Sequence, residues 1–141
     1  MPEAMHSDVM SIAVEATAAT SGFVTFPMED VERSIPERFE RQVLLSPDKI
    51  AVADSESTLT YRELNRLANH VAHAVLATRG AEPEPVALLI GSGVAVIAAM
   101  LGVLKAGKFY VTLDTSQPDA RTVAILAECR PALLITDSGH M

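Results

Sequence analysis

The most constraining feature of the sequence is an uncharged run of nineteen residues, VALLIGSGVAVIAAMLGVL, at positions 86–104. A helix of that length can cross a lipid bilayer. However, Gly91 and Gly93 interrupt the run, and two glycines so close together are typical of a turn. They separate a short β-forming segment from a segment rich in Ala, Leu and Met. We therefore expect a buried strand, a tight turn and a buried helix of an α/β protein, with a membrane span over 86–104 as the open alternative.

The rest of the chain continues this alternation of extended and helical segments. The sequence predicts extended segments at residues 50–53, around Leu59, and at 86–90, 109–113 and 132–136. It predicts helices between Ser34 and Ser46, over 60–78 and 94–106, and from Ser116 to Cys129. Alternating strands and helices imply right-handed crossovers, so the predicted fold class is α/β with a parallel sheet and crossover helices.

Three predicted helices begin with a residue suited to capping. Ser34 with Glu37 and Thr60 with Glu63 form Ser/Thr-x-x-Glu boxes, and Ser116 is followed three residues later by an acidic residue. On the helix over 60–78, one apolar stripe has helical spacing. It consists of Leu64, Leu67, Ala68, Val71 and Val75.

The composition limits the class of protein further. The 141 residues are 49% apolar, which is enough for one domain with a core and excludes disorder over the whole chain. The net charge of −7 disfavours nucleic acid as a partner. Residues 1–33 hold six acidic residues and one basic residue, so we interpret them as an acidic tail or linker and 34–141 as the folded part. A single cysteine and the lack of a targeting signal agree with a cytoplasmic protein.

Two features lie where a ligand could bind in an α/β fold. Gly91, Ser92 and Gly93 fall between a strand and a helix, where a phosphate can meet a helix N-terminus. The third glycine of the dinucleotide pattern is replaced by Val96, so a plain tight turn is the favoured interpretation. Asp114 follows an apolar strand at the edge where ligands collect, although bonding of the turn backbone is the more common role there.

Metal and thiol chemistry are not supported by the remaining candidates. His70 and His73 are spaced to share a metal, but both lie away from the apolar stripe, and solvent exposure is predicted. Cys129 lies near a helix C-terminus, where the helix dipole does not favour the thiolate, so a buried thiol is predicted.

Several segments together resemble one known family. Residues 59–64, LTYREL, and 104–114, LKAGKFYVTLD, are similar to the first two core motifs of adenylate-forming enzymes, in the form found in adenylation domains of nonribosomal peptide synthetases. Residues 35–40, 47–52, 114–121 and 133–137 also resemble their counterparts in such domains. The resemblance covers about residues 34–141 and implies the N-terminal part of an adenylate-forming enzyme's large domain. Departures occur at Thr112, Thr115 and Lys108, where proline or glycine is usual, and we expect them to affect local stiffness only.

The resemblance implies ATP-dependent activation of a carboxylic acid. In that reaction a carboxylate oxygen attacks the α-phosphate, pyrophosphate leaves, and the acyl group passes to a carrier-protein thiol. The family's phosphate loop, substrate pocket and catalytic lysine correspond to segments beyond Met141, so no catalytic, cofactor-binding or metal residue is assigned. ATP and Mg²⁺ are expected for the complete enzyme, and no cofactor is expected on this fragment.

Two functions from different classes therefore stay open. The first is the N-terminal piece of an adenylation domain, inactive alone. The second is a non-catalytic interaction module that docks to a synthetase or complements a separate fragment of one, because a parallel sheet with an open edge needs a partner. The expected partners are the remainder of such a domain and, for the complete enzyme, a carrier protein. Neither nucleic acid nor membrane is expected, and self-association through exposed apolar surface is a further expectation.

Overall fold

The computed structural model describes residues 26–137 of the chain. Its elements, in chain order, are η1 (Met28–Asp30), α1 (Ile35–Leu45), β1 (Ile50–Ala53), β2 (Thr58–Thr60), α2 (Tyr61–Arg79), β3 (Pro85–Leu89), α3 (Val94–Lys105), β4 (Phe109–Thr112), α4 (Asp119–Cys129) and β5 (Leu133–Thr136). The predicted α/β class is confirmed, and each predicted segment falls on an observed helix or strand.

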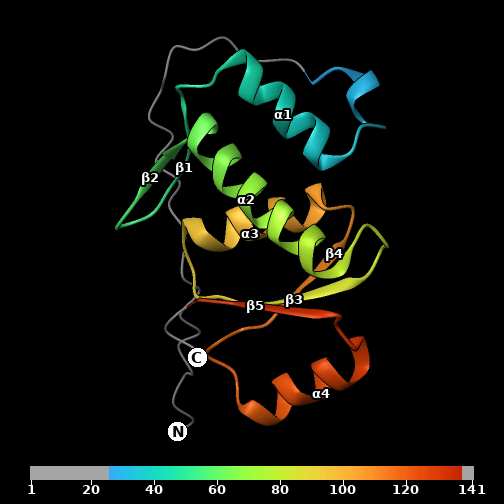
Figure 1. Cartoon of the computed structure of the whole chain (residues 1–141). Helices are drawn as coiled ribbons and strands as arrows, with labels where there is room; N and C mark the ends of the chain where they lie inside the picture. The colour runs from blue at the N-terminus through green and yellow to red at the C-terminus, as the bar shows by residue number, and fades with distance from the viewer. Residues whose placement is uncertain (1–25, 138–141) are drawn as a thin grey trace, which may run out of the picture.

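A parallel sheet forms the centre of the molecule, in the strand order β4-β3-β5. The central strand β3 pairs with β4, from Pro85 opposite Phe109, and with β5, from Val86 opposite Leu133. Helices α2 and α3 cover one face of the sheet, whereas α4 lies on the other face (Figure 1). The crossover through α3 leads from β3 to β4 on one side of β3, and the crossover through α4 leads from β4 back past β3 to β5 on its other side. Because crossovers of the same hand that run in opposite directions use opposite faces of a sheet, α3 and α4 lie on opposite faces.

The uncharged run at 86–104 supplies six of the twelve buried apolar residues among residues 26–137. Its first part is β3 and its second part is α3, and Val86, Leu88, Ala99 and Val103 form one buried cluster between them. The glycine pair thus separates a strand from a helix, as expected. Within residues 26–137, no helix is both long and apolar enough to cross a membrane.

Helices α2 and α3 pack closely at Gly102, in the last turn of α3. A Cβ atom at this position would lie 2.5 Å from Val71 Cβ and 2.8 Å from the backbone oxygen of Ala68. Only glycine therefore permits the observed distance between the two helices. On α2 itself, Leu64 and Ala68 of the predicted stripe are buried, whereas Leu67 is 40% exposed and does not belong to the core.

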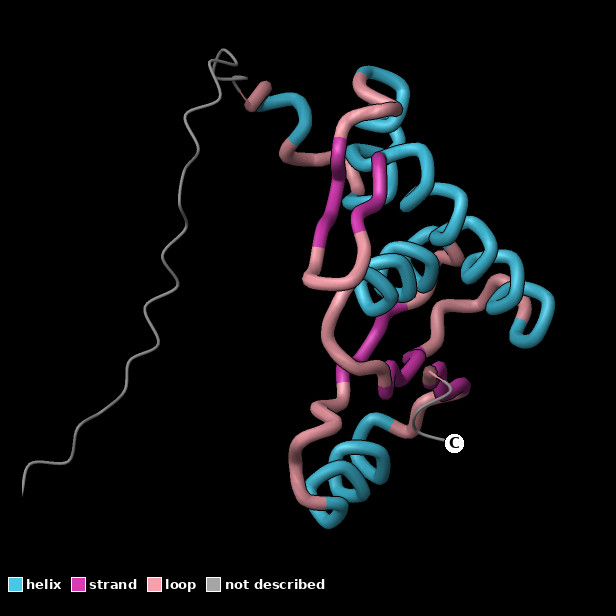
Figure 2. The backbone as a smooth tube through the Cα atoms, turned by 90° about the vertical axis from the view of Figure 1, so that its left-hand side faces the viewer, coloured by secondary structure: helices cyan, strands magenta, loops and turns pink. Residues whose placement is uncertain are grey.

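The predicted alternation also implies that the extended segments before α2 belong to the parallel sheet, and this expectation is wrong. β1 and β2 pair antiparallel with each other and form a separate two-stranded hairpin (Figure 2). Only a short turn joins β1 and β2, which favours antiparallel pairing between neighbours, whereas a parallel neighbour would need a longer crossover.

The capping predictions are confirmed for two helices and wrong for the third. Ser34 and Thr60 each accept a hydrogen bond from the backbone three residues later, and Glu37 and Glu63 complete the two capping boxes. Ser116 does not cap α4, which begins after Pro118 and has no side-chain cap.

Candidate functional site

The turn after β3 is tight and depends on glycine. Gly93 is the N-cap of α3 and has φ +119°, a backbone conformation that residues with a side chain rarely adopt. A Cβ atom on Gly93 would also lie 2.6 Å from Asp54 Oδ2. The turn therefore needs glycine for two reasons, its backbone angle and the close approach of a carboxylate.

That carboxylate comes from the β1–β2 hairpin, about forty residues earlier in the chain. Asp54 Oδ2 accepts a hydrogen bond from Val94 N at 2.9 Å, and Oδ1 accepts from Glu56 N at 2.8 Å and Ser57 N at 2.7 Å. These bonds, with Val94 contributing most, hold the pKa of Asp54 below its ordinary value. Asp54 thus caps α3 from another element and links the hairpin to the start of that helix.

The glycine turn does not fit a nucleotide phosphate in this arrangement. The N–H of Val94 at the start of α3 already donates to a carboxylate, and a phosphate beside Asp54 would meet a like charge. The prediction of a tight turn is confirmed. The turn is held on its other side as well, because Gly91 N donates to Asp137 Oδ2 at 3.0 Å, just beyond β5.

Asp114 lies in the loop after β4 and bonds that loop. Its Oδ1 accepts from Ser116 N at 2.8 Å and from Ser116 Oγ at 2.6 Å, and its backbone oxygen accepts from Gln117 N. The Ser116 hydroxyl contributes most to holding the pKa of Asp114 below its ordinary value. The turn-bonding role that the sequence favoured is therefore present, and it explains why Ser116 does not cap α4.

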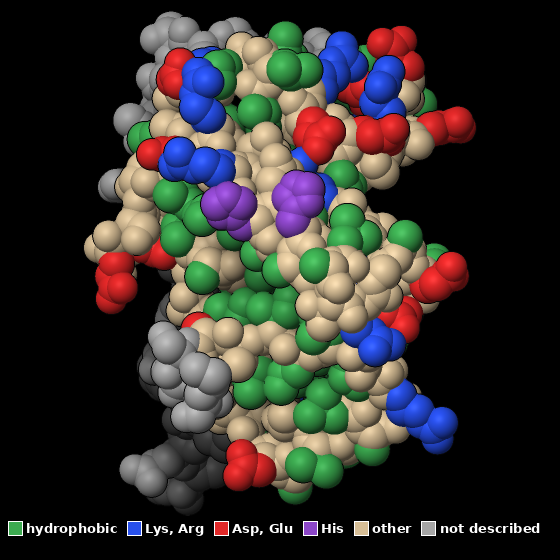
Figure 3. Space-filling view, in the orientation of Figure 1, with side chains coloured by type: hydrophobic (Ala, Val, Ile, Leu, Met, Phe, Trp, Pro, Cys, Tyr) green, Lys and Arg blue, Asp and Glu red, His purple; other side chains and the backbone are tan. Residues whose placement is uncertain are grey.

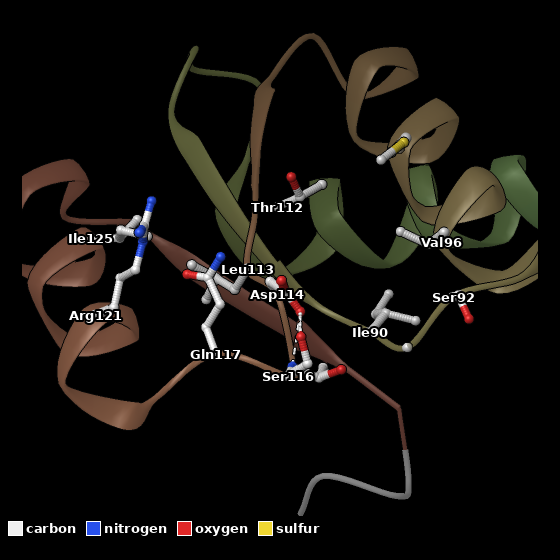
Figure 4. Close-up of a pocket in the computed structure, with 13 residues that line it drawn as sticks. Ile90, Ser92, Val96, Thr112, Leu113, Asp114, Ser116, Gln117, Arg121 and Ile125 are labelled. Atoms are coloured by element: carbon white, nitrogen blue, oxygen red, sulfur yellow. Dashed lines mark hydrogen bonds between the residues drawn. The ribbon is translucent and has the colours of Figure 1, made fainter. Parts of the chain in front are cut away.

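An open hollow of about 720 Å³ lies at the carboxyl ends of β3 and β4 and brings these candidates together (Figure 4). Gly91 and Ser92 line it on one side, Asp114 lies at the loop, and Arg121 reaches it from the first turn of α4. Its apolar wall is formed by Ile90, Val96, Met100, Leu113 and Ile125. Ligands of open α/β sheets collect at this edge, so this hollow is the candidate functional site among the described residues.

The two histidines and the cysteine lie away from that hollow. His70 and His73 are both exposed on α2, as expected, and are visible as neighbouring purple side chains in Figure 3. Cys129 is partly buried with a free thiol near the end of α4. In the part of the chain that the structure describes, no group of three or more metal-ligating side chains could hold an ion.

Lys108 is a residue whose role the sequence reasoning missed. Its side chain is fully buried, and Nζ donates to the backbone oxygen of Glu82 at 2.6 Å and lies 3.3 Å from Glu84 Oε2. Arg79 donates to both carboxylate oxygens of Glu84 and, with Lys108, lowers the pKa of that carboxyl. The expectation that Lys108 affects only local stiffness is wrong, because its ammonium joins the start of β3 to the start of β4. In the sequence, the one sign of this role is that Lys108 follows Gly107 and directly precedes the segment predicted as a strand at 109–113.

Comparison with known proteins agrees with this fold and these motifs. A sequence model of the family described as AMP-binding enzyme matches residues 39–141. The chain therefore belongs to the family of AMP-binding enzymes.

Its relatives include large synthetases. Gramicidin S synthase 2 of Brevibacillus brevis is 42% identical over 101 residues, which cover 71% of this chain and 2% of the relative. CymA of Salinispora arenicola, whose name describes a non-canonical nonribosomal peptide synthetase, is 41% identical over 111 residues, 74% of this chain and 1% of CymA. The AMPPNP-bound structure of the nonribosomal peptide synthetase FmoA3 has a TM-score of 0.68 and 34% identity, over 73% of this chain and 11% of FmoA3.

The predicted resemblance to adenylation domains of nonribosomal peptide synthetases is thereby confirmed. The chain spans only 1–2% of the length of these two sequence relatives, so it matches a short part of a much larger protein.

Proposed function

We propose that this chain forms the front part of an adenylation domain, which uses ATP to activate a carboxylic acid in nonribosomal peptide synthesis. The observation that carries the proposal is the family match over residues 39–141, together with relatives that are nonribosomal peptide synthetases. In this proposal residues 34–141 are a piece of the N-terminal subdomain, and 1–33 are the linker that precedes it. The complete enzyme works in the cytoplasm and passes its product to a carrier protein.

The chain positions other parts of the domain and does not contact ATP or Mg²⁺ itself. Asp114, which lines the hollow, and Asp54, at the start of α3, already bond backbone groups. Arg121 is the one cation among the residues that line the hollow. Its single positive charge offsets the carboxylate of Asp114 and does not neutralise a triphosphate. Adenylate formation needs several positioned charges at the phosphates, and the described residues do not supply them.

Amino-acid-dependent exchange of pyrophosphate into ATP tests this proposal. The 141-residue chain alone should give exchange at the background level with every amino acid. A chimera in which this chain replaces the matching residues of the gramicidin S synthase 2 adenylation domain should restore exchange with that domain's own amino acid. The same domain with the matching residues deleted is the control. Robust exchange by the chain alone, or a folded chimera without exchange, would overturn the proposal.

A second candidate function is an interaction module without catalysis of its own. It is favoured by one observation, an apolar groove beside β5, whose outer edge pairs with no strand among residues 26–137. Co-purification of the chain with a separately produced adenylation fragment, under conditions where the chimera gives no exchange, would support this second function over the first.

A further inference from the structure

Helix α4 has a second apolar face, on the side away from the sheet. The half-buried residues of the helix have helical spacing: Thr122, Ile125, Leu126 and Cys129. A second set with the same spacing is exposed on the opposite side, which we call the outer face of α4: Ala120, Val123, Ala124 and Ala127. Figures 1 and 2 show no other described helix or strand beyond α4. A surface helix ordinarily carries polar residues on such a face, so the packing of the described residues does not account for this apolar one.

Charged residues flank the outer face on both sides. At 3.6 residues per turn, Arg121 and Glu128 fall on one flank, whereas Asp119 and the C-cap residue Arg130 fall on the other. Each flank therefore has one acidic and one basic residue at opposite ends of the helix, in opposite order on the two flanks. Asp119, Glu128 and Arg130 form no ion pair with another described residue.

A second copy of α4, laid antiparallel on this face, meets each of these charges with its opposite. Two-fold symmetry brings equivalent flanks together and reverses the direction of the helix. Arg121 then lies opposite Glu128 of the second copy, and Asp119 lies opposite Arg130 of the second copy. Both pairings are centred between Ala124 and Ile125, so one arrangement satisfies both of them. A parallel arrangement would place like charges opposite each other, and such flanking charges set the orientation of paired helices.

The outer face is also suited to close contact between two copies. Three of its four residues are alanines, which allow two helix axes to approach to about 8 Å. The flanks hold two acidic and two basic residues, so this face is neutral although the whole chain has a net charge of −7. A pair of eleven-residue helices buries a small area, so the association is weak.

We propose that the outer face of α4 binds the same face of a second copy of this chain, as a two-fold antiparallel pair of helices. The inference goes beyond the proposed function and does not depend on it, because it rests on the surface of α4 alone.

Sedimentation of the 141-residue chain over about 10 μM to 1 mM, the range of weak small interfaces, tests the proposal. The average mass should rise from 15.0 kDa toward twice that value. Ala124→Glu places a charge in the middle of the outer face and should weaken association at least about tenfold. Ala77→Glu, at an exposed position of α2, is the matched control and should leave association unchanged. A constant mass of 15.0 kDa, or equal effects of the two variants, would overturn the proposal.

Exchange of charges between the two ends of the helix tests the antiparallel arrangement. Arg121→Glu and Glu128→Lys each place like charges opposite each other, so each variant alone should associate about tenfold more weakly. An equimolar mixture of the two variants should associate as tightly as the unsubstituted chain, because each flank then pairs opposite charges again. Both substitutions suit the helix dipole, so loss of association should occur without loss of helix in circular dichroism. A mixture as weak as its separate components would overturn the proposal.

The remainder of an adenylation domain is the other possible occupant of this face. In the chimera with the gramicidin S synthase 2 domain, Ala124→Glu should leave pyrophosphate exchange unchanged. Loss of exchange in that chimera, with no loss in the chimera carrying Ala77→Glu, would assign the outer face to the rest of the domain and overturn the proposal. The sedimentation results are independent of exchange, so failure of the proposed function would leave them unaffected.

Discussion

Asp54 bonds backbone groups from two parts of the chain, its own hairpin turn and the start of α3. The sequence predicts no role for Asp54, which directly follows the extended segment at residues 50–53. Its role was not predictable from spacing, because its partner Val94 is forty residues away and the contact depends on the folded position of the hairpin. By contrast, the roles of Gly93 and Asp114 in their turns were predictable, because they depend on neighbours within a few residues.

The hydrogen bonds of Asp54 make a pH-dependent contribution to stability. Since its pKa is lowered in the folded protein, this contribution is complete above the unfolded-state pKa near 4 and is lost as the pH falls through the folded-state pKa. We expect Asp54→Asn to lower the free energy of unfolding at about pH 7 and to differ less from the unsubstituted chain at about pH 3. Urea unfolding at both pH values measures this.

Glu56→Gln is the control for that experiment, because it removes one charge from the same exposed hairpin turn without a side-chain bond to α3. It should leave the free energy of unfolding nearly unchanged at both pH values. If Asp54→Asn were equally destabilising at the two pH values, the loss would come from geometry and not from the charge of Asp54.

At the level of helices and strands, local signals predicted the boundaries well. Both Ser/Thr-x-x-Glu boxes are formed, because each involves side chain and backbone three residues apart. The helix α4 ends at Cys129, as the sequence predicts, and Arg130 follows in the left-handed conformation with φ 43° before Pro131. Two predictions at this scale are wrong. The Ser116 hydroxyl donates to Asp114 and does not cap α4, and β1 pairs with β2 and not with the parallel sheet.

The contact between α2 and α3 gives a prediction at this scale. Gly102→Ala should lower the free energy of unfolding by about 1–3 kcal/mol, because the added Cβ meets Val71 and the backbone of Ala68. This loss should occur although alanine favours helices over glycine by about 1 kcal/mol. Urea denaturation measures the change. Ala95→Gly, at an exposed position of the same helix, is the control for helix propensity, and a gain in stability for Gly102→Ala would contradict the close packing.

On the scale of the whole molecule, the two faces of the sheet are covered unequally. The face with α2 and α3 carries both buried clusters, whereas α4 alone covers the other face and has no buried residue. The parallel direction of the sheet strands could be predicted from the alternation of elements. The strand order β4-β3-β5 could not, since a right-handed crossover can lead to either side of β3.

This inequality predicts a hierarchy of local opening. Amides of α4 should exchange with solvent at least about tenfold faster than those of α2 and α3, because few apolar contacts hold α4 on the sheet. Native-state hydrogen exchange measured by NMR on the isolated chain gives the rates. Equal protection of all three helices would show that α4 unfolds only with the whole molecule.

The close approach of Asp54 to Gly93 has an evolutionary consequence. A serine, threonine or aspartate at position 93 would cap α3 by itself and would also exclude the Asp54 carboxylate, whose Oδ2 lies 2.6 Å from where a Cβ would stand. The two positions are therefore constrained as a pair. Across homologous sequences, glycine at 93 should accompany a carboxylate at 54, and a self-capping residue at 93 should release position 54 to vary.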